Sequence, residues 1–150
     1  MRDCSNSEQT LPAERPFYIG SEIYRRSTYG PTHPLAIPRV STCTDLAAAL
    51  GWLDAARYRD APLATDAELA RFHDPDYLAA LKRAEARRMV SAADAARFRL
   101  GLDGNPVYAE MFRRPATSAG GVLLATRLTA QGGTVHCPGG GTHHGRRDRA

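Results

Sequence analysis

The chain has 150 residues, of which 43% are hydrophobic and 24% charged, a composition that fits one soluble globular domain and excludes a wholly disordered chain. Its formal net charge is +4, and Lys82 is the only lysine among 20 basic residues. The arginines are spread through an alanine-rich chain, whereas a nucleic-acid binder usually gathers its charge on one face. The charge therefore gives little indication of a partner.

The cysteines and the apolar runs bear on the cellular compartment. Cys4, Cys43 and Cys137 are odd in number and far apart, so we expect no disulfide framework. Residues 1–16 lack the apolar stretch of a secretory signal, and no apolar run reaches the roughly 18 residues that span a bilayer. We therefore expect a cytoplasmic protein without a membrane segment.

The first third of the chain predicts one strand, one loop and one helix. Residues 1–16 lack periodicity and are expected to form a flexible leader. An apolar triplet at 17–19 predicts a short buried strand. Glycine and two prolines within 29–34 predict a loop, and the apolar spacing over 38–53 predicts a helix.

The middle of the chain predicts a second strand and then helices. Residues 58–62 could form a short strand, and Thr65 with Glu68 three residues later has the pattern of a capping box. A further helix is expected to begin at Asp74 or Pro75 and to break within 91–94.

The last third predicts a loop, a helix and a strand. Residues 100–106 read as a loop, and 116–130 as an apolar helix in which the small residues 119–121 permit close packing. Residues 134–137 predict a strand that leads into a glycine-rich loop. A covering helix normally follows such a strand. We therefore expect an α/β fold with a partial parallel sheet flanked by helices, residues 17–150 forming the amino-terminal part of a larger domain.

The glycine-rich loop holds the most informative residues, the adjacent histidines His143 and His144 after three glycines. Imidazole titrates near neutrality, so two rings in one pocket could act as a general acid and base. A surface loop is the alternative. Two other readings are weaker: a zinc site that adds His136 and Cys137, whose side chains alternate on a strand, and a phosphate loop, which lacks the usual motif.

Other polar candidates have an ordinary structural explanation. Asp103 lies in a Gly-Asn-Pro turn, where aspartate commonly bonds its own backbone, although a loop carboxylate could instead accept hydrogen bonds from a substrate amide. His33 and His73 fit structural roles better than catalytic ones. Arg39 fits a surface charge unless something buries it.

Seven short motifs in order carry a family resemblance. They are Tyr29-Gly30-Pro31-Thr32-His33-Pro34, Arg39, Ala64-Thr65-Asp66-Ala67-Glu68-Leu69, Phe72-His73-Asp74-Pro75-Asp76-Tyr77-Leu78, Asp103-Gly104-Asn105-Pro106-Val107, Ala119-Gly120-Gly121 and Gly140-Gly141-Thr142-His143-His144. Together they resemble the amino-terminal half of the histone deacetylase superfamily, particularly its bacterial acetoin utilization branch. The resemblance implies the arginase/deacetylase fold.

The resemblance also implies an activity and roles for individual residues. It implies zinc-dependent hydrolysis of an acetyl-lysine protein or an acetylated small molecule. By position, His144 would be the general base and acid, and His143 its electrostatic partner. Asp103 would hold the substrate at the rim with Gly140 and Gly141, and Arg39 would be the buried arginine of the product channel.

The resemblance places the zinc ligands and a carbonyl-binding tyrosine after the tandem histidines, beyond Ala150. We therefore expect the 150-residue chain neither to bind catalytic zinc nor to turn over substrate. A rival reading is a small arginine-rich module that contacts nucleic acid or another anionic partner through Arg83, Arg87, Arg88 and residues 146–149, although acidic residues interrupt this stripe.

Overall fold

The computed structural model of the chain describes residues 16–26, 29, 33, 36–141 and 145–150. Its elements, in chain order, are β1 (Phe17–Gly20), α1 (Ile23–Arg26), α2 (Arg39–Ala49), β2 (Tyr58–Asp60), α3 (Asp66–Leu69), α4 (Pro75–Arg87), α5 (Ala92–Phe98), α6 (Arg113–Thr129) and β3 (Val135–His136). The predicted leader, 1–16, lies almost wholly outside the described residues.

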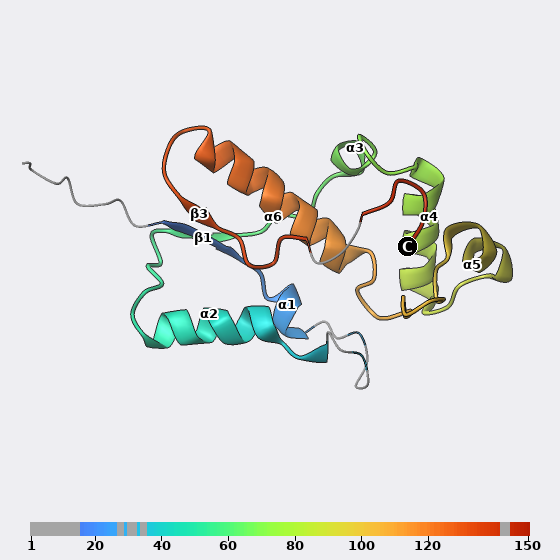
Figure 1. The fold of residues 1–150 in the computed structure, drawn as a ribbon, viewed down its shortest axis with the longest axis horizontal. Coiled ribbons are helices and arrows are strands. Elements are labelled where there is room, and N and C mark those ends of the chain that lie inside the picture. The colour runs from blue at the N-terminus through green and yellow to red at the C-terminus, as the bar shows by residue number, and fades with distance from the viewer. Residues whose placement is uncertain (1–15, 27–28, 30–32, 34–35, 142–144) are drawn as a thin grey trace, which may run out of the picture.

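The three strands form one parallel sheet in the order β2-β1-β3, with β1 in the centre. Because side chains alternate along a strand, β1 has two different faces. Ile19, which is almost fully buried, faces Gly121 of α6. Tyr18 lies on the other face, where its hydroxyl and that of Thr44 in α2 are 2.7 Å apart. The sheet therefore lies between α6 and α2 (Figure 1).

A second group of helices, α3, α4 and α5, lies beyond one end of α6 (Figure 1). One apolar cluster there joins α4 to α5 and to the loop that follows α5; its buried members are Tyr77, Ala80, Ala84, Phe98, Leu100 and Met111. A second cluster joins α3 and α4 to the start of α6, and its buried members are Ala64, Leu69, Leu78, Phe112 and Ala116. These two clusters hold most of the buried apolar residues.

The predicted α/β class with a partial parallel sheet is confirmed, and the strands and most helices lie where the pattern places them. The predicted helix 38–53 ends earlier, at Ala49, since Gly51 adopts a φ of +70° that ends the helix. The predicted helix 116–130 begins earlier, at Arg113, since a side chain from α4 satisfies its first amide groups. Thr65, Asp74 and Ser91 cap α3, α4 and α5.

Within the described ranges, none of the helices combines the length and hydropathy that crossing a bilayer requires.

Candidate functional site

The strand order places a topological switch point at the carboxyl ends of β1 and β3. After β1 the chain passes through α1 and α2 to β2 on one side of the sheet, whereas β3 adds on the other side. Parallel α/β sheets bind ligands at such points, because the connections that leave the two strands diverge and open a crevice. The segments that leave β1 and β3 are therefore where a site is expected.

The segment that leaves β1 contributes aromatic rings. Tyr24 in α1 is 3% exposed, and its hydroxyl is 3.3 Å from Ser118 Oγ in α6. Burial raises the pKa of Tyr24, so this phenol is neutral at physiological pH. Further along, the rings of Tyr29 and His33 stack at 4.9 Å. Within the predicted loop 29–34, the structure describes only Tyr29 and His33.

The segment that leaves β3 is the glycine-rich loop. Gly139 lies directly against the ring of Tyr24, so closely that a Cβ at this position would be 2.3 Å from Tyr24 Cζ. The Gly140 amide donates to the Cys137 carbonyl at 3.1 Å, and Gly141 has a φ of +40°. This turn requires glycine at its first positions, and it leads directly to residues 142–144. The predicted catalytic residues His143 and His144 lie outside the described residues.

The turn that holds Asp103 lies beside the segment after β1. His33 Nε2 is 3.3 Å from the Gly104 carbonyl oxygen, and this contact joins the two loops. Asp103 has a φ of +52°, and its carboxylate accepts a hydrogen bond from Arg99 Nε at 3.0 Å. The predicted rim carboxylate therefore has a cationic partner within the chain, and its contact with a substrate stays a prediction.

Arg39 and His73 occupy different surroundings. Arg39 is the first residue of α2 and is exposed, so the structure does not bury it as the resemblance implies for a channel arginine. The ring of His73 packs between Phe72 and Tyr77, at 4.9 and 5.8 Å, in agreement with a structural role. His73 Nδ1 is buried, and no described residue forms a hydrogen bond with it.

His136 and Cys137 face opposite sides of the sheet, as the alternation predicts. The ring of His136 is 5.3 Å from that of Tyr18 on the α2 face, whereas Cys137 Sγ lies beside Gly121 on the α6 face. Burial raises the pKa of the Cys137 thiol. Cys137 and Cys43 are both free thiols. The two residues on β3 therefore do not contribute to one common metal site.

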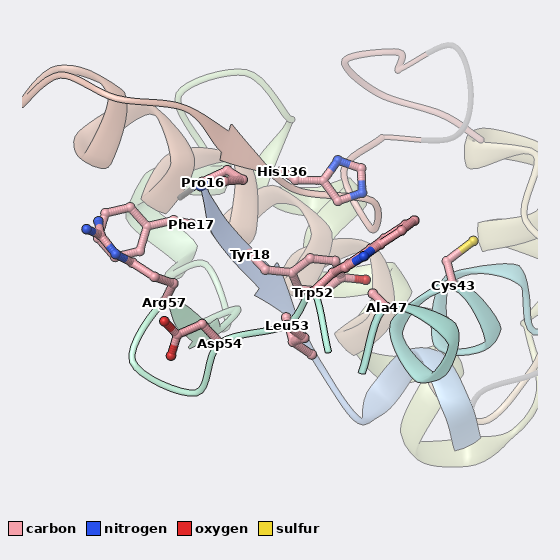
Figure 2. A pocket seen from close by; sticks show the side chains of 10 residues that line it. All are labelled: Pro16, Phe17, Tyr18, Cys43, Ala47, Trp52, Leu53, Asp54, Arg57 and His136. Atoms are coloured by element: carbon pink, nitrogen blue, oxygen red, sulfur yellow. The ribbon is translucent and has the colours of Figure 1, made fainter. Parts of the chain in front are cut away.

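A shallow apolar pocket of about 250 Å³ lies on the α2 face of the sheet, away from the glycine-rich loop. Figure 2 shows Tyr18 and His136 on the strands and Cys43 and Ala47 on α2, with Trp52 between the two groups. Trp52 is 73% exposed, and α2 has a single buried residue, Ser41. This face of the molecule is thinly covered, and among the described residues that the sequence proposed for a site, His136 of the weaker zinc reading is the one that lines it.

The comparisons with known proteins agree with this arrangement. The histone deacetylase domain family matches residues 33–150, and the chain belongs to this family. The match contains the turn at Asp103, the glycine-rich loop and the two histidines. The predicted resemblance is thereby confirmed.

Individual proteins and a solved structure are also similar to the chain. Acetoin utilization protein AcuC of Bacillus subtilis (strain 168) is 32% identical over 135 residues, or 89% of this chain and 35% of the relative. AcuC of Staphylococcus xylosus is 30% identical over 97% of this chain and 37% of the relative. The crystal structure of an HDAC homolog from Aquifex aeolicus matches with a TM-score of 0.86 and 31% identity, covering 91% of this chain and 37% of that one. The chain spans about a third of the length of these relatives.

Two residues that are not among the predicted site residues help to shape the site. Glu85 in α4 accepts hydrogen bonds from the Phe112 and Arg113 amides at 2.8 and 3.0 Å, and so fixes the start of α6. Arg114, one residue later, turns its guanidinium inward among the tyrosines. Helical spacing gives a signal for Arg114, since it shares a face with the buried residues Thr117 and Gly121.

Proposed function

We propose that this chain is the amino-terminal part of a zinc-dependent deacetylase that removes acetyl groups from an acetyl-lysine protein or an acetylated amine. The observation that carries the proposal is the convergence of three motif-bearing loops at the switch point of the sheet. Gly139 lies against Tyr24 of the segment after β1, and His33 of the same segment contacts Gly104. Membership of the histone deacetylase domain family supports the reaction class.

Within the proposal, the residues of this chain bind substrate and move protons. His144 takes a proton from the attacking water and returns it to the leaving amine, and His143 supports it electrostatically. In the free chain the Asp103 carboxylate accepts from Arg99. When substrate binds, Asp103 releases Arg99 and accepts hydrogen bonds from the substrate backbone. The backbone of Gly140 and Gly141 lines the entrance, where the absence of side chains permits close approach.

Zinc is implied by the family, and the described residues do not fit it. No group of three histidine, cysteine or acidic side chains in the described ranges is close enough to hold a metal ion. His136 and Cys137, the nearest candidates to the glycine-rich loop, face opposite sides of the sheet. In the family the ligands follow the tandem histidines. We therefore propose that the 150-residue chain alone releases no acetate from an acetylated substrate.

The rival function, an arginine-rich module for anionic partners, receives little support from the surface. Arg83 pairs with Asp94 at 3.0 Å, and Arg97 pairs with Asp76 at 2.8 Å. Such alternation of charge leaves little net field for a polyanion along this side of α4 and α5.

A chimera tests the proposal. This chain replaces the matching third of the Bacillus subtilis relative, and acetate release from an acetyl-lysine peptide is measured with added zinc. We expect activity that a chelator removes and that His144→Ala lowers by about a hundredfold or more. His136→Ala is the matched control, because it removes a histidine on β3 that lies outside the motif.

Two results would contradict the proposal. One is a folded chimera that binds zinc but has no activity on acetyl-lysine peptides or acetylated polyamines. The other is acetate release by the 150-residue chain alone that His144→Ala abolishes, which would refute the dependence on the rest of the domain.

A further inference from the structure

Arg114 is a half-buried cation without a counter-ion in the described part of the chain. Its Nε and Nη1 atoms are inaccessible to solvent and have no hydrogen-bond partner among the described residues. Burying these two N–H groups without acceptors costs free energy, and a neutral side chain of similar length would fill the same space without that cost. Each such unsatisfied group in a folded protein calls for an explanation.

The surroundings of Arg114 are tyrosine rings from separate segments. Its Cζ atom lies 4.5 Å from the ring centroid of Tyr29 and 5.9 Å from that of Tyr24, within the range of cation–π attraction. The ring of Tyr108 packs against Tyr29 at 4.8 Å. Burial and the neighbouring Tyr29 raise the pKa of Tyr108, whereas the charge of Arg114 opposes that rise. The guanidinium is therefore the shared neighbour of all three rings.

Each of these rings belongs to, or contacts, one of the three loops at the switch point. Tyr24 supports Gly139 in the glycine-rich loop. Tyr29 stacks on His33, which in turn contacts Gly104 in the turn that holds Asp103. Tyr108 begins the approach to α6 just after that turn. A single side chain on a rigid helix thus lies at the junction of all three loops.

We propose that Arg114 is a positioning residue, whose cation holds the tyrosines together and thereby fixes the glycine-rich loop relative to the turn at Asp103. The inference rests on the proposed function only for the role of these loops as the substrate site. The described side-chain neighbours of Arg114 are Tyr24, Tyr29 and Tyr108, and Asp103 is not among them. Its effect passes through Tyr24 to the glycine-rich loop and through Tyr29 to the turn.

The experiment measures amide hydrogen exchange by NMR in the 150-residue chain and in single variants. Arg114→Met removes the charge and keeps an unbranched side chain. We expect exchange at Gly140 and Asn105, whose amides bond Cys137 and Leu102 at 3.1 and 2.9 Å, to accelerate by about tenfold or more. Exchange at Leu78, in α4, should stay within about twofold of the parent value. Arg114→Lys restores a cation above Tyr29 and should recover most of the protection.

Arg127→Met is the matched control, because Arg127 lies in the last turn of the same helix and pairs with Glu68 on the surface. It should leave Gly140 and Asn105 unchanged. Unchanged exchange at these two amides in Arg114→Met, or equal acceleration at Leu78, overturns the proposal. If Arg114→Met does not fold, Tyr29→Leu carries the test, and unaltered exchange at Asn105 then overturns it. No step measures catalysis, so a failure of the proposed activity is recognised separately.

Discussion

Individual glycines set how closely α6 approaches the rest of the molecule. Gly120 faces the segment after β2, where an added Cβ would lie 1.9 Å from the Pro62 carbonyl oxygen and 2.9 Å from the Ala64 nitrogen. Both contacts are with backbone, which cannot rotate away. The small residues 119–121 predict close packing of this helix, and Gly120 is the position where the structure leaves no room for a side chain.

Gly120→Ala is therefore expected to destabilise the chain by about 3 kcal/mol, although alanine is the better helix former by about 1 kcal/mol. Urea unfolding followed by circular dichroism measures the difference. Gly121→Ala is the matched control, since its Cβ would be 3.2 Å from Ala61 Cβ and 3.3 Å from Cys137 Sγ, contacts that small shifts relieve. Equal losses in both variants would refute the role of the Pro62 contact.

At the scale of elements, α6 depends on a cap from another helix. Phe112 occupies the N-cap position and offers no side-chain acceptor. The Glu85 carboxylate replaces it, with Oε2 accepting from the Phe112 and Arg113 amides and Oε1 from Arg113 Nε at 2.6 Å. An anion at a helix N-terminus also meets the positive end of the helix dipole. Glu85 thereby fixes α6 against α4.

Glu85→Ala should cost about 2 to 3 kcal/mol, because charge-assisted hydrogen bonds at a largely buried helix end are lost together. The free energy of unfolding in urea measures this. A double-mutant cycle with Arg113→Ala separates the side-chain pair from the amide bonds. If Glu85→Ala causes no loss of stability in the Arg113→Ala background, the bonds to the Phe112 and Arg113 amides contribute nothing. That result would contradict the capping role.

The short helix α3 depends on its own capping box. The Thr65 hydroxyl accepts from the Glu68 amide at 3.2 Å, and Glu68 Oε2 accepts from the Thr65 amide at 2.9 Å. These bonds and the ion pair with Arg127 hold the pKa of Glu68 below its usual value. The stability that Glu68 contributes is thus present above the ordinary glutamate pKa and is lost as the pH falls through the lowered one.

Thr65→Ala is expected to destabilise the chain by about 1 kcal/mol at neutral pH. The difference from the parent should shrink in acid, because protonated Glu68 no longer accepts as a carboxylate. Thr65→Ser keeps the acceptor oxygen and serves as the control. Urea unfolding at neutral and acidic pH provides the measurement, and a loss in Thr65→Ser as large as in Thr65→Ala would exclude the cap as the cause.

The elements differ in how well the sequence predicts them. Local signals, such as Thr65 with Glu68 or Asp74 before Pro75, predict helix starts that the structure confirms, because both partners are neighbours in the chain. The start of α6 is missed by three residues, because its cap comes from Glu85 in another helix. Periodicity within a segment contains no information about such a partner.

At the scale of the whole molecule, the site depends on contacts between residues that are far apart in the chain. The motifs predict the family and the three loops, yet the exposure of Arg39 and the contact of Arg99 with Asp103 become visible only in three dimensions. The inward position of Arg114 depends on tyrosines 85 and 90 residues away in the chain. The site is thus predictable as a set of loops, whereas the packing that joins them depends on distant residues.

Tyrosines from several elements give the whole chain a common response to alkaline pH. Burial, assisted by Asp60, raises the pKa of Tyr58 to about 12, and burial also raises the pKa values of Tyr24, Tyr77 and Tyr108. An unfolded tyrosine ionises near pH 10. Above that pH the native state retains protons that the unfolded state has lost, so the free energy of unfolding must fall as the pH rises.

Urea unfolding at pH of about 8, 10 and 11 should therefore give a progressive fall in stability, and native-state tyrosinate absorbance should lag behind that of the urea-unfolded chain. Asp60→Asn removes one cause of the raised pKa of Tyr58, so its native titration should begin at lower pH while the other three phenols stay neutral. Stability that is constant across this range would mean that the tyrosines are equally accessible in both states. That result would contradict the tight packing of Tyr24 against Gly139 and of Tyr108 against Tyr29, on which the arrangement of the loops depends.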